Sequence, residues 1–256
     1  MHLKIKHFVV FITFIGLISC REGQKKTLTS IQAEEVLMDS TIKGVDAVEK
    51  FVAPYRTRIN EVLDAPLAYA PYDITKTDGD LNTSAGNLLV DAIFDQANPI
   101  YKEMTGHAID FVLMNHGGIR ADIPQGDVNT RTAYQVMPFE NSIVVVQLPG
   151  KAVLGMVEYL VKSKRAHPIS KMQVILDNNH AIKSLSIQGK PFEEQRTYHV
   201  ATSNYLVSGG DDMVFFKGMT GTTDTGYLIR NALVDYFTKV DTLTPRVDDR
   251  FIKTSP

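Results

Sequence analysis

Strand-like and helix-like segments are interspersed along this chain, and their order constrains the fold more than any other feature. Five segments are short, with apolar or alternating patterns typical of β-strands. They are Ile109–Met114, Ser142–Leu148, Met172–Leu176, Ala181–Ile187 and Thr197–Ser203. The turn-forming tripeptide Asp177-Asn178-Asn179 separates two of them and predicts a hairpin.

Four other segments have apolar residues at helical spacing. In Thr41–Leu63, Pro54 predicts a break or kink. In the helix that begins near Ser84, this serine is the predicted N-cap and Pro99 the predicted end. The remaining helices are predicted at Lys151–Lys164 and Gly226–Thr238. Because helices and strands do not alternate strictly, we expect an α+β fold with α/β-like character, in which a mixed β-sheet is flanked by helices in a single domain.

The N-terminus has the pattern of an export signal. Two lysines precede the apolar segment Phe8–Ile18, which is short for a bilayer span. Leu17-Ile18-Ser19-Cys20 resembles a bacterial lipobox, and Cys20 is the only cysteine of the chain, so it has no partner for an internal disulfide. We expect a lipoprotein signal peptide at residues 1–19 and lipidation at Cys20. The alternative is a cleaved secretory signal that happens to contain a cysteine.

These features predict an exported protein on a membrane, on its periplasmic or surface face. Residues 20–40 are polar and suit a tether, and residues 41–256 are the predicted folded domain. The formal net charge of −2 indicates no basic field of the kind that recruits nucleic acid. A small anionic ligand, held by a few local groups, remains compatible with this balance.

Three loops follow apolar segments and between them contain glycine, polar and aromatic residues: Asn115–Arg120, Met137–Asn141 and Asn204–Asp212. Loops at strand ends often carry binding groups. Each also has a purely structural interpretation. The glycine pairs 117–118 and 209–210 would supply left-handed turns. Phe139 and Tyr205 would be core side chains, Asp211 would cap a turn, and Arg120 would form a structural ion pair.

Together, the same loops describe a nucleotide pocket. Two aromatic rings can sandwich a nucleobase, and such stacking contributes about 1–3 kcal/mol per base. An aspartate can accept hydrogen bonds from ribose hydroxyls, and an arginine offers a bidentate fork for phosphate. This interpretation requires the three loops to meet in space.

Three motifs resemble the C-terminal domain of bacterial and animal 5′-nucleotidases and UDP-sugar hydrolases. They are "SAGNLLVDAI", "NHGGIRADIPQGDVNTRTAYQVMPFENSIVVVQLPG" and "YHVATSNYLVSGGDDM", in the family's order and spacing over about residues 45–240. The resemblance implies that Asn115 and Arg120 contact the nucleotide and orient its phosphate. It also implies that Phe139 packs against the base and that Asp211 binds the ribose hydroxyls.

The predicted substrate-binding residues also include Gly117, Gly210 and Tyr205. Tyr205 stands where the family usually has a second stacking phenylalanine. The tyrosine hydroxyl needs a hydrogen-bond partner. In another departure, no cation lies between Lys76 and Gly86, where the family often has a further substrate-binding arginine. This departure predicts a weaker phosphate contact, or one shared with another chain.

The metal-binding elements of the complete enzymes do not occur in this sequence. The resemblance implies that complete enzymes of this family also have a larger N-terminal metallophosphatase domain. That domain binds two divalent metals through Asp-x-His, Gly-Asn-His-Asp and Gly-His-x-His elements. Asn115-His116 echoes one of them only superficially, so we do not expect His116 to bind a metal. We find no nucleophile elbow or phosphate-binding glycine loop either. We therefore predict no catalytic residue and no cofactor in this chain, with divalent metals only in a metallophosphatase partner.

The sequence thus predicts a hydrolase-family protein, incomplete as a catalyst by itself, that forms the nucleotide-recognition half of a 5′-nucleotidase in nucleotide catabolism. Its expected partners are a nucleotide or nucleoside, a separate metallophosphatase chain and, through the lipid, a membrane. One alternative is a non-enzymatic surface lipoprotein that captures nucleotides or nucleosides. Another is a structural relic that binds neither.

Overall fold

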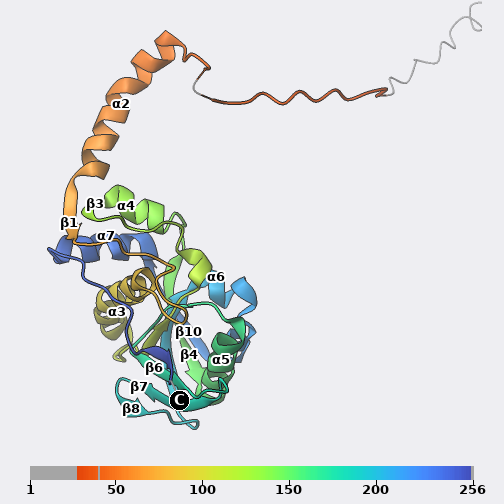
Figure 1. Ribbon diagram of the computed structural model, residues 1–256, viewed down its shortest axis with the longest axis vertical. Coiled ribbons are helices and arrows are strands. Elements are labelled where there is room, and N and C mark those ends of the chain that lie inside the picture. Colours follow the sequence, from red (N-terminus) through yellow and green to blue (C-terminus); the bar gives the residue numbers. More distant parts are fainter. Residues whose placement is uncertain (1–27, 40, 255–256) are drawn as a thin grey trace, which may run out of the picture. The chain divides into compact units, whose positions relative to one another are not determined.

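The computed structural model describes residues 28–39 and 41–254 (Figure 1). The chain divides between Lys50 and Phe51, and the larger unit contains every strand reported below. Residues 28–39 are exposed and form no helix or strand. The predicted signal peptide and Cys20 lie outside the described residues, so both stay predictions, as do the domain boundaries.

The main sheet has five strands in the order β10-β4-β9-β2-β5. Strands β2 and β9 are parallel, whereas the other three neighbouring pairs are antiparallel, so the sheet is mixed. The bounds are β2 (Phe111–Leu113), β4 (Ser142–Pro149), β5 (Ile169–Ser170), β9 (Thr197–Ser203) and β10 (Gly221–Leu228).

Two smaller sheets complete the strands. One has the order β11-β6-β7-β8 and includes the predicted hairpin, in which β6 and β7 pair antiparallel. The other pairs β1 with β3. The bounds are β1 (Pro66–Ala70), β3 (Gly126–Asn129), β6 (Met172–Leu176), β7 (Ile182–Ile187), β8 (Lys190–Pro191) and β11 (Phe251–Lys253).

Helices cover both faces of the main sheet. Helices α3 (Ser84–Thr105) and α7 (Ile229–Lys239) share one core with Val145, whereas α5 (Gly150–Ser163) shares the other with Val146 (Figure 1). Because successive side chains of a strand point to opposite faces, a strand buried on both faces needs a continuous apolar run. The prediction of a mixed sheet flanked by helices is confirmed.

The remaining helical segments are short, except for α2, which is the first helix of the described residues. They are α2 (Asp46–Asp64), α4 (Thr130–Val136), α6 (Asn204–Val207) and the 3₁₀ turns η1 (His116–Gly118), η2 (Gly210–Asp212) and η3 (Val214–Gly218). Among the described residues, none belongs to a helix long and apolar enough to cross a membrane.

Neither proline ends its helix, so the predicted end at Pro99 and a break at Pro54 were wrong, and a kink at Pro54 stays a prediction. Helix α2 continues through Pro54, and α3 continues through Pro99 to Thr105. A proline removes one backbone donor, and the other intrahelical bonds remain. In α3, tertiary packing adds to them, because Ala97 and Tyr101 on either side of Pro99 are buried.

Two helix starts also differ from prediction. The N-cap of α3 is Thr83, whose side chain accepts a hydrogen bond from the Gly86 amide, and not Ser84. Helix α7 begins at Ile229, because Gly226 to Leu228 belong to β10. Strand β10 escaped prediction because it lies at the sheet edge, where its alternate residues are exposed and its sequence is polar.

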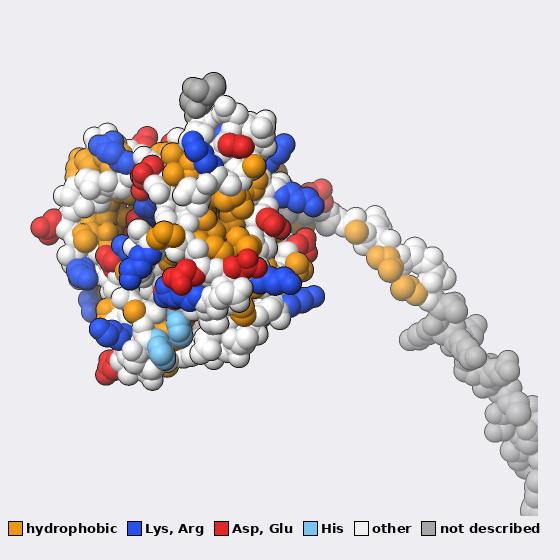
Figure 2. All heavy atoms as spheres, turned by 90° about the horizontal axis from the view of Figure 1, so that it is seen from below, with side chains coloured by type: hydrophobic (Ala, Val, Ile, Leu, Met, Phe, Trp, Pro, Cys, Tyr) orange, Lys and Arg blue, Asp and Glu red, His pale blue; other side chains and the backbone are white. Residues whose placement is uncertain are grey.

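The surface carries charges of both signs. On the face that Figure 2 shows, basic and acidic side chains are interspersed, in keeping with the formal net charge of −2. This mixed surface lacks, on that face, the single-sign stripe that typically accompanies nucleic-acid binding.

Candidate functional site

Sheet topology brings the three predicted binding loops to one edge. Strands β2 and β9 are parallel neighbours, so the loops that follow them leave the sheet on the same side. Strand β4 runs antiparallel to β9, with Ile143 opposite Ser203, so the loop before β4 lies at that edge too. A backbone hydrogen bond of 2.9 Å from the Arg120 amide to the Val136 carbonyl joins the first loop to the end of α4.

A pocket of about 330 Å³ lies between these loops. Six of the seven predicted substrate-binding residues line it: Asn115, Gly117, Arg120, Phe139, Tyr205 and Asp211. The seventh, Gly210, lies directly beneath the Tyr205 ring. Gly118 and Asn141 complete the lining. The loops therefore meet as the nucleotide interpretation requires, whereas the binding role of each residue stays a prediction.

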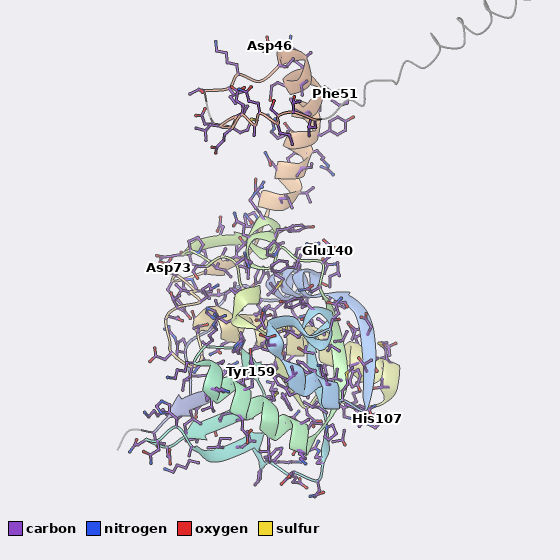
Figure 3. The ribbon with its side chains drawn as sticks, turned by 90° about the vertical axis from the view of Figure 1, so that its right-hand side faces the viewer. Asp46, Phe51, Asp73, His107, Glu140 and Tyr159 are labelled. Atoms are coloured by element: carbon purple, nitrogen blue, oxygen red, sulfur yellow. The ribbon has the colours of Figure 1, made fainter. Side chains whose placement is uncertain are left out.

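Asp211 is the most highly connected residue of this pocket. Its Oδ2 accepts a hydrogen bond from Asn115 Nδ2 at 2.9 Å, and its Oδ1 accepts one from the Tyr205 hydroxyl at 3.3 Å. The backbone of Asp211 is left-handed, with φ of 52°. Its carbonyl accepts a hydrogen bond of 2.7 Å from the hydroxyl of Tyr159, a residue of α5 that Figure 3 labels. These contacts hold a backbone conformation that few residues adopt readily.

The two aromatic residues are not core residues. The exposed fractions are 37% for Phe139 and 45% for Tyr205, and both rings face the pocket. The Arg120 guanidinium lies 5.6 Å from the centroid of the Phe139 ring, within range of a cation–π contact. A cation and two accessible rings thus border one small cavity.

The glycines act mainly through close approach. Of the two pairs, only Gly209 has a left-handed φ, at 100°. Gly117, Gly118 and Gly210 lie in the tight turns η1 and η2 without it, so the predicted left-handed φ was wrong for these three. A Cβ atom on Gly118 would lie 2.9 Å from Asn115 Oδ1, and one on Gly210 would lie 2.4 Å from the Tyr205 ring. Both glycines leave room for the side chain that lines the pocket.

His116 does not line the pocket. Its backbone amide donates to Nδ1 of His167 at 3.3 Å, and burial, with help from the charge of Lys76, lowers the pKa of its imidazole. Among the described residues, no group of three or more histidine, cysteine, aspartate or glutamate side chains is arranged to hold a metal ion.

Sequence reasoning missed several residues around the site. Asn141 lies in the same loop as Phe139 and was the easiest to find. Tyr159 and His167 gave no signal, because they lie on α5 and after it, outside the three loops. Lys76, the last cation before the α3 helix, donates from Nζ to the Ile119 carbonyl at 2.5 Å. It braces the first loop without lining the pocket.

His167 predicts a dependence of stability on pH. The residue is 1% exposed, and burial lowers the pKa of its imidazole from 6.5 to about 4. Because protons bind the unfolded chain first, stability is full above about pH 6.5 and falls as the pH drops toward 4. The loss reaches up to about 3 kcal/mol.

Urea denaturation at about pH 7 and about pH 4.5 measures this loss. Asparagine at position 167 retains an acceptor for the His116 amide but does not titrate. We therefore expect His167→Asn to be less stable at neutral pH, with a smaller decrease on acidification. Equal decreases in the variant and the wild type would contradict the assignment to His167.

Residues 68–218 match the model of the family described as "5′-nucleotidase, C-terminal domain". The chain belongs to this family. The predicted family resemblance is therefore confirmed, and it covers the three loops of the pocket.

Relatives of this 5′-nucleotidase C-terminal domain are longer proteins. Protein UshA of Escherichia coli is 24% identical over 232 residues, which cover 87% of this chain and 40% of UshA. The 5′-nucleotidase of Vibrio vulnificus is 25% identical over 226 residues, which cover 84% of this chain and 38% of that enzyme. The chain thus spans about two fifths of the length of these curated relatives.

A solved structure shares the fold. The 5′-nucleotidase precursor from Thermus thermophilus superposes with a TM-score of 0.67 at 22% identity, over 82% of this chain and 43% of that protein. At this identity the similarity establishes the fold alone.

Proposed function

We propose that this chain is the nucleotide-recognition part of a 5′-nucleotidase. The observation that carries the proposal is the single pocket where two accessible aromatic rings, a carboxylate and a guanidinium come together. These groups match the planar base, the diol and the phosphate of a nucleoside monophosphate. Membership in the 5′-nucleotidase C-terminal domain family supports the same substrate class.

In this proposal each part of the nucleotide has its own contact. The base lies between Phe139 and Tyr205, where stacking contributes about 1–3 kcal/mol. The ribose hydroxyls donate to Asp211, since an ionised carboxylate only accepts hydrogen bonds. Arg120 and Asn115 contact the phosphate and orient it toward the mouth of the pocket.

We also propose that the dimetal phosphatase domain lies on a separate polypeptide. The absence of a suitable group of metal ligands among the described residues supports this division of labour. Such metals would generate the attacking hydroxide and neutralise the phosphate. This chain would contribute binding and orientation.

AMP hydrolysis tests both proposals. The whole chain, with Mg²⁺ or Mn²⁺ added, is expected to bind AMP but to release no phosphate. Adding a metallophosphatase chain from the same genome should start the release, and Phe139→Ala should reduce it. Phosphate release by this chain alone, or a native polypeptide that carries both domains by mass spectrometry, would contradict the separate-chain proposal. Tight AMP binding that no added metallophosphatase alters would favour the alternative function, a non-enzymatic lipoprotein that captures nucleotides.

Attachment to a membrane through lipidated Cys20 is a further part of the proposal. Its support is the lipobox-like sequence Leu17-Ile18-Ser19-Cys20. Cys20→Ala should release the protein from the membrane fraction and remove the mass of the acyl chains. If the variant stays in that fraction with an unchanged mass, the anchor is not at Cys20.

A further inference from the structure

The Asp211 carboxylate has a protein hydrogen-bond donor on each oxygen. Asn115 donates to Oδ2 at 2.9 Å, and the Tyr205 hydroxyl donates to Oδ1 at 3.3 Å. Both donors are pocket-lining side chains, and so is their acceptor. The oxygen that faces Tyr205 therefore already accepts one hydrogen bond, and a second donor would have to share it.

The position of the Tyr205 hydroxyl is set by the surrounding backbone. Tyr205 lies in the first turn of α6, which Ser203 caps by accepting a hydrogen bond from the Leu206 amide. Its ring lies flat against Gly210, so close that a Cβ atom there would be 2.4–2.7 Å from three ring carbons. Gly210 thus limits ring movement on one side and keeps the hydroxyl oxygen within reach of Asp211.

We propose that the Tyr205 hydroxyl determines sugar selectivity: it competes for Asp211 Oδ1 and weakens the preference of the pocket for a sugar with a vicinal diol. This inference rests on the proposed nucleotide site. A ribose hydroxyl that binds Asp211 exchanges with, or shares the acceptor with, a donor already present. Its net gain is therefore smaller than at a carboxylate oxygen without a protein donor.

The same geometry defines the test variant. Tyr205→Phe retains the stacking ring and the contact with Gly210, and it removes only the donor to Oδ1. Asn115 still holds Oδ2, so the carboxylate keeps its orientation. In this variant, a diol hydroxyl of the ligand donates to Oδ1 without competition from position 205.

Calorimetry with adenosine and 2′,3′-dideoxyadenosine measures the selectivity of the whole chain. The two probes share the base, so their affinity ratio isolates the diol. We expect Tyr205→Phe to raise the preference for adenosine about three- to tenfold, the size of one net hydrogen bond. Tyr69→Phe, which removes an exposed tyrosine hydroxyl on β1, serves as the matched control and should leave the ratio unchanged.

The outcomes separate this inference from the proposed function. If the wild type binds both nucleosides and Tyr205→Phe leaves the ratio unchanged or lowers it, the selectivity inference is overturned alone. A lowered ratio would mean that the hydroxyl contacts the sugar directly. If the wild type binds neither nucleoside nor AMP, the proposed function is overturned and this inference with it.

Discussion

Replacing Asp211 with asparagine is expected to weaken adenosine binding about 3- to 30-fold. Hydrogen bonds to a charged group contribute roughly 1.5–3 kcal/mol, and the neutral amide loses the charge and one acceptor oxygen, but Tyr205 already donates to Oδ1 and reduces the loss below the top of that range. Asparagine tolerates the left-handed backbone at this position, where φ is 52°, so the fold should be retained. Calorimetry with adenosine, together with a thermal melt, measures both effects.

Asp212 provides the matched control for this substitution. It is the neighbouring aspartate, has nearly the same φ at 54°, and is exposed outside the lining of the pocket. Asp212→Asn should leave adenosine binding unchanged, and Asp211→Asn should hardly affect 2′,3′-dideoxyadenosine. Equal losses in the two variants would show that charge near the pocket, and not the Asp211 contact, governs binding.

Gly210→Ala is expected to lower adenosine affinity about 5- to 100-fold. The added Cβ would lie 2.4 Å from Cε1 and 2.5 Å from Cζ of Tyr205, far below a normal contact. Because the φ of Gly210 is not left-handed, alanine fits the backbone and the ring must move instead. The pocket then loses a stacking wall that contributes about 1–3 kcal/mol.

Two further variants show whether Gly210→Ala acts through Tyr205. In the Tyr205→Ala background, the alanine at position 210 should cost no further affinity, since the two changes remove the same contact. Gly155→Ala, in α5 with no atom within 4 Å of the new Cβ, should bind normally and gain about 0.5–1 kcal/mol of stability. Additive losses at positions 205 and 210 would contradict the ring-displacement explanation.

Much of the secondary structure followed from the sequence pattern. Strand β4 lies where an apolar run predicts it, because a strand buried on both faces leaves a continuous apolar signal. Strands β6 and β9 also lie where they were predicted, but β6 is buried in alternation and β9 contains polar residues. Strand β10 and the helix end at Pro99 were mispredicted. An edge strand is polar on its exposed side, and tertiary packing can retain a helix across a proline.

The sequence by itself determined which chemical groups the loops offer: two aromatic rings, an aspartate, an asparagine and an arginine beside glycines. Only the tertiary structure decided that they share one pocket. The parallel pairing of β2 with β9, whose partners Phe111 and Val200 lie far apart in the chain, brings the loops together. Likewise, the contacts of Tyr159 and Tyr205 with Asp211 depend on the path of the backbone. Local sequence patterns record how a segment is buried, but they do not record which distant segment lies beside it.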